Sequence, residues 1–371
     1  MRIKKQMFIA MESYYTKIFV KWGMIMNKLR IAVIFGGCSP EHDISLKSAH
    51  NVIVHMDRTK YEVVTIGITR MGEWLQYFGE PAHIATDTWH EADCAPFIIS
   101  PCRIKQELKV DAAFPILHGK NGEDGTIQGL LEMANIPIIG CGILASALCM
   151  DKNVSHKLVK LAGVKVPRSV VDNHNRAADM DLSYHYPLFV KPARAGSSFG
   201  ITLVESKDDL PHAIGLASKF DRKVIIEEAV EGFEVGCAII GNGDSDDLII
   251  GEVDEIELTR DFFCHHEKYT LETSAIHVPA RIPPHKSEEI KATAINIYKA
   301  LGCSGFARVD MFLTPQGDIV FNEVNAIPGL TAGSRFPNML KAAGMTFEEI
   351  INAIIETAII DTATIETGVR T

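Results

Sequence analysis

The chain has 371 residues, 47% of them hydrophobic and 23% charged, which is ordinary for a globular protein and suits two or three domains. Its formal net charge of -10 excludes bulk attraction to nucleic acid or to an anionic membrane, although a local basic pocket for phosphate is compatible with it. The eight cysteines are scattered and include no Cys-x-x-Cys pair, which predicts reduced thiols in the cytoplasm and neither a disulfide framework nor a zinc site.

Residues 1–26 form a basic, partly apolar extension that we expect to lie outside the core fold. Lys17 and Lys21 interrupt its apolar run, and no small-residue cleavage site follows, which argues against a signal peptide or a membrane span. A helix on a membrane surface is the minor alternative.

The next part, residues 27–145, alternates apolar strands with helices. This alternation predicts an α/β domain built on a parallel sheet, with binding residues at the carboxyl ends of its strands. The continuous apolar run that ends in Gly36-Gly37 is typical of a buried parallel strand. The predicted strands are 29–35, 61–68, 111–117 and 136–139, and the predicted helices are 41–53 and 126–134.

From Asp151 onwards the pattern changes to shorter extended segments, which predicts two lobes of the α+β type. We assign residues 146–233 to a central lobe and residues 234–371 to a C-terminal lobe. The predicted strands are 188–191, 200–204, 223–230, 235–240, 248–253, 307–313 and 318–324, and the predicted helices are 151–162, 286–301 and 347–362.

The last two predicted strands carry the most informative side chains. Side chains alternate faces along a strand, so Arg308 and Asp310 share one face, and so do Glu323 and Asn325. If the hairpin closes around Gln316, Asp310 lies nearly opposite Glu323. Two carboxylates and an amide oxygen suit Mg²⁺, which is usually held together with nucleotide phosphates. The hairpin therefore predicts a nucleotide-dependent enzyme, and a polar solvent face is the alternative.

Lys191 ends a predicted strand and leads into a glycine- and serine-rich loop that contains Ser197 and Ser198. Such a loop can offer backbone N–H and hydroxyl donors to phosphates, and Lys191 adds a point charge. The loop does not fit the Walker pattern. Lys152, at the start of a predicted helix, is a second possible phosphate lysine. Taken alone, the loop would be a flexible turn and Lys152 a surface lysine.

A third candidate segment runs from Glu227 to Glu234 at the end of another predicted strand. The backbone of a strand end, here Ala229 and Val230, can bind an adenine edge, and a carboxylate such as Glu234 can accept the two ribose hydroxyls. Solvated acidic residues at a strand end are the alternative.

Lys152, Lys191 with its loop, the 227–234 segment and the hairpin occur in an order that resembles the ATP-grasp fold, in which two α+β lobes hold ATP and Mg²⁺. The closest likeness is to the D-alanine–D-alanine ligase family, over about residues 26–362. Three further motifs agree in order and spacing: Phe35-Gly36-Gly37-Cys38-Ser39-Pro40-Glu41; His118-Gly119 with Gly122-Glu123-Asp124-Gly125; and Pro328-Gly329-Leu330-Thr331 with Ser334-Arg335-Phe336-Pro337.

The resemblance implies an ATP-dependent carbon–nitrogen ligase. In this family the carboxylate of one D-alanine attacks the γ-phosphate of ATP, and the amine or hydroxyl of a second molecule then displaces phosphate from the acylphosphate. Two Mg²⁺ or Mn²⁺ ions on Asp310, Glu323 and Asn325 would neutralise developing charge, while Lys152 and Lys191 would clamp the ATP phosphates.

The same resemblance implies a site for the two amino acids. Glu41 would hold the amino group of the first D-alanine, and Ser197 would help to orient Glu41 and a loop tyrosine. Arg308 and the Gly329 N–H would stabilise the tetrahedral oxyanion, and Ser334 would bind the carboxylate of the second substrate. The residues that the motifs place in this site are Glu41, His118, Ser197, Tyr269, Arg308, Gly329 and Ser334.

The segment 261–269 resembles the mobile loop that closes over the phosphates in this family. Lys268-Tyr269 is similar to the pair found in members that add an amino acid. Members that add lactate lack this pair and carry a histidine in the loop, and His265-His266 is also present here. The loop therefore leaves the choice between amine and hydroxyl open.

Arg335 is a second clue to the second substrate. Ordinary D-alanine–D-alanine ligases carry an apolar residue there, whereas glycopeptide-resistance variants tend to carry arginine. An arginine near the second subsite could favour a substrate with an added hydroxyl, and Phe263 points the same way. The alternative is that Arg335 faces solvent or pairs with a surface acid.

We therefore expect D-serine as the second substrate, then D-alanine, then D-lactate. The resemblance further implies a homodimer that makes a dipeptide for peptidoglycan precursors, either for vancomycin resistance or, as a housekeeping ligase, for routine cell-wall synthesis. A different ATP-grasp ligase is a rival interpretation, but it would leave Glu41, His118 and Ser334 without a substrate. A non-catalytic nucleotide-binding protein is another, but it would be expected to have lost Arg308 or a metal carboxylate.

Overall fold

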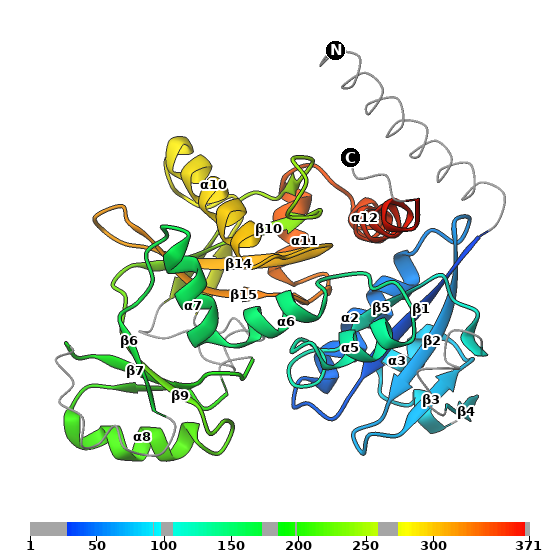
Figure 1. Ribbon diagram of the computed structural model, residues 1–371, viewed down its shortest axis with the longest axis horizontal. Helices are drawn as coiled ribbons and strands as arrows, with labels where there is room; N and C mark the ends of the chain where they lie inside the picture. The colour runs from blue at the N-terminus through cyan, green and yellow to red at the C-terminus, as the bar shows by residue number, and fades with distance from the viewer. Residues whose placement is uncertain are drawn as a thin grey trace, which may run out of the picture.

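The computed structural model describes residues 28–91, 93–97, 107–172, 185–196, 199–258 and 274–367. The predicted extension 1–26 lies outside these residues. Three sheets organise the described chain, and Figure 1 shows the N-terminal sheet on one side and two further sheets on the other. Within the described ranges, no helix combines the length and the apolar character needed to cross a membrane.

The N-terminal sheet has the strand order β4-β3-β2-β1-β5. Its centre is parallel, as the alternation of strands and helices predicts, but two short antiparallel strands extend one edge. The predicted strand 136–139 is reduced to a single bridge between Ala113 and Ile138. The elements are β1 (Leu29–Gly36), α2 (His42–His55), β2 (Tyr61–Ile68), β3 (Trp74–Tyr77), α3 (Pro81–Ala85), β4 (Cys94–Pro96), β5 (Ala112–Ile116) and α5 (Thr126–Met133).

The central sheet is small and antiparallel, in the order β6-β9-β7-β8. One helix packs against it, and the apolar residues of the sheet and of this helix form a hydrophobic cluster of their own. The elements are β6 (Ser169–Asp172), β7 (Leu188–Pro192), β8 (Thr202–Val204), α8 (Leu210–Ala217) and β9 (Val224–Glu228).

The C-terminal sheet is antiparallel, in the order β13-β12-β10-β14-β15, with β11 paired to β10. The predicted bounds of the strand 248–253 are wrong, since β11 covers only Ile249–Ile250 and the next strand, β12, begins at Asp254. The strands are β10 (Phe233–Ile240), β11 (Ile249–Ile250), β12 (Asp254–Leu258), β13 (Ser274–His277), β14 (Phe306–Leu313) and β15 (Ile319–Asn325). The helices are α6 (Ile143–Met150), α7 (Lys152–Leu161), α10 (Pro284–Ala300), α11 (Arg335–Ala342) and α12 (Phe347–Thr367).

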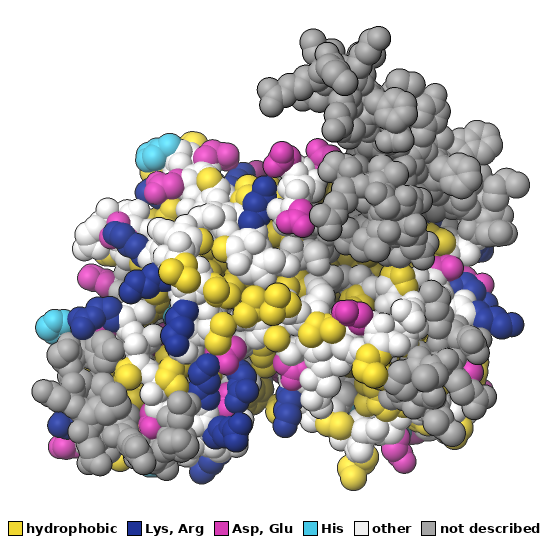
Figure 2. All heavy atoms as spheres, in the orientation of Figure 1, with side chains coloured by type: hydrophobic (Ala, Val, Ile, Leu, Met, Phe, Trp, Pro, Cys, Tyr) yellow, Lys and Arg dark blue, Asp and Glu magenta, His cyan; other side chains and the backbone are white. Residues whose placement is uncertain are grey.

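The N-terminal sheet and the C-terminal part share one hydrophobic core. Phe306 of β14 lies edge-on to Phe114 of β5 at 5.8 Å and to Phe336 of α11 at 5.6 Å. Helix α12 joins the same core, and Figure 1 shows it between the two parts. The small central sheet stands apart from this core. Figure 2 shows a notch between it and the N-terminal part, with lysine and arginine side chains along its flank.

Candidate active site

The β14–β15 hairpin has the predicted register. Asp310 lies opposite Glu323, and Arg308 lies opposite Asn325. The register shifts between Asp310 and Met311, so that Asn322 is a bulged residue with no residue opposite it. The bulge turns the Asn322 carbonyl towards His156 of α7, whose Nε2 lies 2.9 Å away. The four polar side chains therefore gather at the end of the hairpin next to α7.

Asp310 is almost fully buried and its carboxylate is held from two sides. Arg308 donates to both oxygens, from Nε at 2.7 Å and from Nη2 at 2.6 Å, and Asn325 Nδ2 donates to Oδ2 at 2.8 Å. Burial on its own would lower the pKa of Arg308, but the charge of Asp310, its hydrogen bonds to Arg308 and the charge of Asp254 together outweigh burial and raise the pKa. Because the amide nitrogen of Asn325 faces Asp310, its oxygen points away from that carboxylate.

Lys152 lies beside the predicted metal carboxylate. Its Nζ is 3.0 Å from Glu323 Oε2 and donates to the Ala195 carbonyl at 3.1 Å, at the start of the glycine- and serine-rich loop. Burial would lower the pKa of Lys152, but the nearby carboxylates, Glu323 first among them, outweigh burial and raise it. Asp151 caps α7 and accepts a hydrogen bond from Lys223 Nζ at 2.7 Å. Because Lys223 directly precedes β9, this contact ties the start of α7, and so Lys152, to the central sheet.

Lys191 and Glu227 form a buried ion pair on adjacent strands of the central sheet. The second oxygen of Glu227, Oε2, is buried without a hydrogen-bond partner among the described residues. An unpaired buried acceptor is costly, so this oxygen suits a ligand that brings a donor. The Ala229 N–H already donates to the Pro187 carbonyl at 3.1 Å, which leaves Val230 as the next backbone position at this strand end.

A cavity of about 580 Å³ joins the hairpin to the N-terminal sheet. This volume is typical of a small-molecule site. Glu41 approaches it from the turn before α2, and a side chain on Gly196 would come within 2.7 Å of the Glu41 carboxylate. A small neighbouring cavity is lined by Lys152, Glu323 and Asn325. The predicted site residues that line the larger cavity are Glu41, His118, Arg308, Asn325, Gly329, Ser334 and Arg335.

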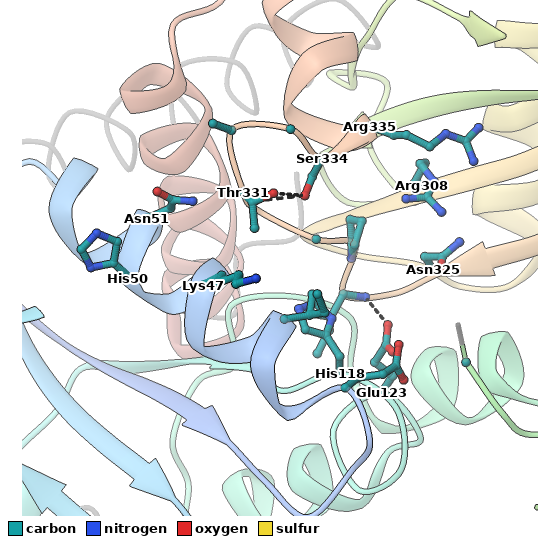
Figure 3. Close-up of a pocket in the computed structure, with 18 of the residues that line it drawn as sticks. Lys47, His50, Asn51, His118, Glu123, Arg308, Asn325, Thr331, Ser334 and Arg335 are labelled. Carbon is teal, nitrogen blue, oxygen red and sulfur yellow. Dashed lines mark hydrogen bonds between the residues drawn. The ribbon is translucent and has the colours of Figure 1, made fainter. Parts of the chain in front are cut away.

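Several residues of this cavity were not predicted. Lys47, His50 and Asn51 belong to α2, and Figure 3 shows them across the cavity from Arg308 and Arg335. Their spacing of three and four places them on one helical face, a signal that the sequence contains but that an ordinary surface helix also produces. The Lys47 side chain at the cavity wall carries a positive charge of the kind that attracts a carboxylate.

The turn that contains Gly329 approaches Ser334 closely. A side chain on Gly329 would lie 2.8 Å from Ser334 Oγ. Ser334 Oγ accepts the Thr331 N–H at 3.1 Å and lies 2.7 Å from Thr331 Oγ1. Figure 3 shows this pair at the rim of the cavity. Ser334 also precedes the first residue of α11, so its hydroxyl lies where a helix N-terminus attracts an anion.

Arg335 is buried, so the alternative of a solvent-facing arginine is wrong. Its Nε and Nη2 donate to both oxygens of the fully buried Asp254, at 2.7 and 2.8 Å, and its Nη1 donates to Glu234 at 2.5 Å. Its Nη1 also lies 3.5 Å from Asp310 Oδ1. Burial on its own would lower the pKa of Arg335, but the surrounding carboxylates outweigh it and the guanidinium stays charged. The structure thus joins Arg335 and Glu234, which were predicted to touch different ligands.

Gly236 of β10 leaves the room that this charge cluster needs. A side chain there would lie 2.6 Å from Arg335 Nη2 and 2.8 Å from Asp254 Oδ1. The substitution Gly236→Ala is therefore expected to lower the free energy of unfolding by about 1–3 kcal/mol, measured by urea denaturation. Gly215→Ala in α8 is the control, because nothing lies within 4 Å of a side chain there. That variant should be neutral or stabilised by up to about 1 kcal/mol. Equal stabilities for the two variants would contradict the packing argument.

Five predicted site residues lie outside the described residues: Ser197, Ser198, Phe263, Lys268 and Tyr269. The structure therefore does not place the tip of the glycine- and serine-rich loop or the predicted mobile loop, and their roles stay predictions. The described cysteines, six in number, are free thiols, as the sequence predicts.

Comparison with known proteins places the chain among ligases. Residues 30–141 match the family described as D-ala D-ala ligase N-terminus, and residues 153–356 match the D-ala D-ala ligase C-terminus. The crystal structure of the VanG D-Ala:D-Ser ligase from Enterococcus faecalis is similar, with a TM-score of 0.83 and 50% identity, over 90% of this chain and 100% of that one.

Two curated relatives have comparable coverage. The vancomycin B-type resistance protein VanB of Enterococcus faecalis is 45% identical over 350 residues, which is 90% of this chain and 99% of the relative. The D-alanine–D-alanine ligase of Caldicellulosiruptor bescii is 40% identical over 354 residues, which is 90% of this chain and 96% of the relative. These likenesses confirm the predicted ATP-grasp fold.

Proposed function

Since the chain belongs to the D-alanine–D-alanine ligase family, and is therefore an ATP-dependent ligase that forms carbon–nitrogen bonds, we propose that it joins D-alanine to D-serine. The observation that carries the choice of D-serine is the buried guanidinium of Arg335, which lines the cavity next to Ser334. The VanG D-Ala:D-Ser ligase, 50% identical, supports the same choice.

The nucleotide would lie between the central sheet and the hairpin. Lys152 and Lys191 are both buried, and each forms an ion pair with a carboxylate that fixes the position of its side chain. Each lysine is therefore positioned to bind phosphate oxygens without a rearrangement of its side chain. The unpaired Oε2 of Glu227 would accept the adenine amino group, next to the backbone of Val230. Glu234 would accept the ribose hydroxyls while it keeps its contact with Arg335.

The residues at the end of the hairpin fit Mg²⁺ or Mn²⁺. Glu323 and Asn325 present hard oxygen ligands to the small cavity beside Lys152, and Asp310 lies behind Asn325. Divalent ions held by these residues would supply positive charge that neutralises the charge developing during phosphoryl transfer. Arg308 stays on the cavity side of Asp310, where it can face the amino-acid carbonyl.

The amino acids would occupy the larger cavity. Glu41 would hold the ammonium group of the first D-alanine, whose carboxylate attacks the γ-phosphate to form D-alanyl phosphate and ADP. The amine of the second substrate then attacks the acyl carbon, and phosphate leaves. Arg308 and the Gly329 N–H would stabilise the oxyanion of this step. Ser334, at the start of α11, would bind the second carboxylate together with Lys47.

Arg335 is a candidate for recognition of the second side chain because it is held rigidly. Asp254 takes two of its N–H groups in a bidentate pair, which fixes the plane of the guanidinium at the cavity wall. A hydroxyl on the second substrate could accept a hydrogen bond there, which a methyl group cannot do. D-alanine is the alternative second substrate, with D-lactate after it. We propose a homodimer in the cytoplasm that supplies peptidoglycan precursors and gives vancomycin resistance.

The proposal is tested by identifying the product. The purified chain is incubated with ATP, Mg²⁺ and D-alanine, with D-serine or D-lactate added at equal concentration, and the products are read by mass spectrometry. Predominant D-alanyl-D-serine supports the proposal, whereas predominant D-alanyl-D-alanine would mean a ligase for routine cell-wall synthesis. Failure to join any pair would refute the activity itself.

Neutralising the Arg335–Asp254 pair should change the ratio of products. The double variant Arg335→Leu with Asp254→Asn avoids leaving the fully buried Asp254 as an unpaired charge. We expect it to lower the preference for D-serine over D-alanine by about 10-fold or more, measured by competition between the two substrates. The double variant Arg281→Leu with Glu255→Gln is the control, since it removes a bidentate pair that does not line the cavity. An unchanged product ratio in the folded double variant would exclude Arg335 from recognition of the second substrate.

A further inference from the structure

The loop that follows β15 is held by side chains from a distant part of the chain. The Ile327 N–H donates to Glu123 Oε1 at 3.1 Å, and the Leu330 N–H donates to Ser48 Oγ at 3.2 Å. The His118 ring makes a hydrogen bond with the Ile327 backbone. We call Ser48, His118 and Glu123 the clasp. Figure 3 shows Glu123 and His118 below the loop, with the Glu123 contact drawn.

The clasp also holds the turn that contains Gly119. Glu123 Oε2 accepts the Gly119 N–H at 2.8 Å, so its two oxygens join the Gly119 turn to the Ile327 loop. Ser48 Oγ lies 3.4 Å from His118 Nε2 and makes the same kind of bridge. Ser48 is fully buried and His118 nearly so. Hydrogen bonds between groups buried from water are costly to lose, so the contacts of Ser48 and His118 make the clasp rigid.

The positions that the clasp holds lie on either side of Gly329. Two residues before it, Ile327 is held through its N–H, and one residue after it, Leu330 is held through its N–H. On the other side, a side chain on Gly119 would collide with the Glu41 carboxylate, so the held turn is the one beside Glu41. The clasp therefore sets the distance between the Glu41 carboxylate and the Gly329 N–H.

We infer that Glu123 and Ser48 are positioning residues that align the Gly329 N–H with the acyl carbon of the first substrate. This inference rests on the proposed function, in which Glu41 holds the first D-alanine and Gly329 stabilises the oxyanion. Neither side chain has to touch the reacting atoms. The effect of Ser48 should be confined to the second step, in which the amine attacks and the oxyanion forms, because Ser48 lies outside the small cavity that Lys152 and Glu323 line. Glu123 lines that cavity as well, so Ser48→Ala separates the two steps more sharply than Glu123→Gln.

The test compares Glu123→Gln and Ser48→Ala with Tyr298→Phe in the full chain. Glu123→Gln keeps the shape but replaces one acceptor oxygen with a donor, and Ser48→Ala removes the acceptor of Leu330. Tyr298→Phe is the matched control, because it deletes a buried hydroxyl that donates to the Gly241 carbonyl at 2.7 Å, away from the cavity lining. The thermal melting of all variants shows whether the deletions cost comparable stability.

Two rates separate the steps. The rate of dipeptide formation depends on both chemical steps. Positional isotope exchange in ¹⁸O-labelled ATP, with D-alanine alone, measures only the reversible formation of D-alanyl phosphate. We expect both Glu123→Gln and Ser48→Ala to lower kcat for the dipeptide by about 10- to 100-fold, and Ser48→Ala to keep the isotope-exchange rate and the KM for ATP near the wild-type values. Tyr298→Phe should leave both rates unchanged. Equal losses in both rates, or a higher KM for D-alanine with an unchanged kcat, would overturn the inference.

Hydrogen–deuterium exchange makes the inference independent of the substrates. Peptides that cover residues 326–331 should exchange faster in both clasp variants than in wild type and in Tyr298→Phe. Unchanged exchange there overturns the clasp even if dipeptide is made. If the wild-type chain makes no dipeptide, the proposed function fails. The comparison of hydrogen–deuterium exchange between the variants then still decides whether the clasp holds the loop.

Discussion

Replacing Glu323 with glutamine is expected to lower kcat about 1000-fold, which corresponds to ~4 kcal/mol of lost transition-state stabilisation. Glutamine keeps the size of the side chain but removes the negative charge that faces the small cavity next to Asn325. It also leaves Lys152, 3.0 Å away, without its nearest carboxylate. Both changes weaken the binding of the divalent ion, so the concentration of Mg²⁺ needed for half-maximal rate should rise as kcat falls.

The matched control lies in the same hairpin. Asp318→Asn makes the same chemical change in the turn, where Asp318 pairs with Lys165 on the exposed surface at 2.6 Å. Exposed pairs contribute little, so this variant should keep the wild-type kcat and Mg²⁺ dependence. Steady-state kinetics across a Mg²⁺ titration measure both variants. A Glu323→Gln enzyme that reached the wild-type rate at high Mg²⁺ would show that Glu323 is no more than a minor ligand.

The substitution Arg308→Lys is expected to lower kcat by about 100- to 1000-fold, the usual loss when an oxyanion donor is removed. Lysine keeps the positive charge, but it cannot donate from two fixed positions to Asp310 as Nε and Nη2 of Arg308 do. The carboxylate of Asp310, which is 1% exposed, would then lose most of its hydrogen bonds. Charge alone would therefore fail to replace the planar guanidinium.

Arg281→Lys controls for the general cost of breaking a bidentate pair. Arg281 binds Glu255 on the same sheet through Nη2 at 2.6 Å, but its side chain is half exposed. This variant should keep its activity. Dipeptide formation at saturating substrates, with circular dichroism as a check on folding, measures both. Comparable rates for the two variants would mean that Arg308 serves the packing of the hairpin and not the reaction.

The hairpin shows how far local patterns reach. The two-residue period of a strand and the position of the turn were enough to predict that Asp310 lies opposite Glu323, and this register is confirmed. Patterns of this kind succeed because the partners are close in sequence. The bulge at Asn322 was not predicted, since it depends on His156, a residue of another helix.

The surroundings of Arg335 mark the limit of the same reasoning. The arginine itself was noticed from its place beside Ser334, but its partners Asp254 and Glu234 lie on other strands, 81 and 101 residues away. No local pattern indicates such a pairing, because it forms only when the sheet and α11 pack. The antiparallel strands β3 and β4 were missed for a related reason. They are short, with four and three residues, and so carry no continuous apolar run of the kind that predicted the parallel strands.

The separate core of the small central sheet has a consequence for how such enzymes diversify. Its hydrophobic cluster contains no residue of α2 or α11, which carry Lys47 and Arg335. Substitutions that change which second amino acid is accepted can therefore accumulate outside the central sheet while that sheet keeps its packing. An ancestral ligase could acquire a new dipeptide product through a few changes around α11, without a compensating change in the packing of the central sheet.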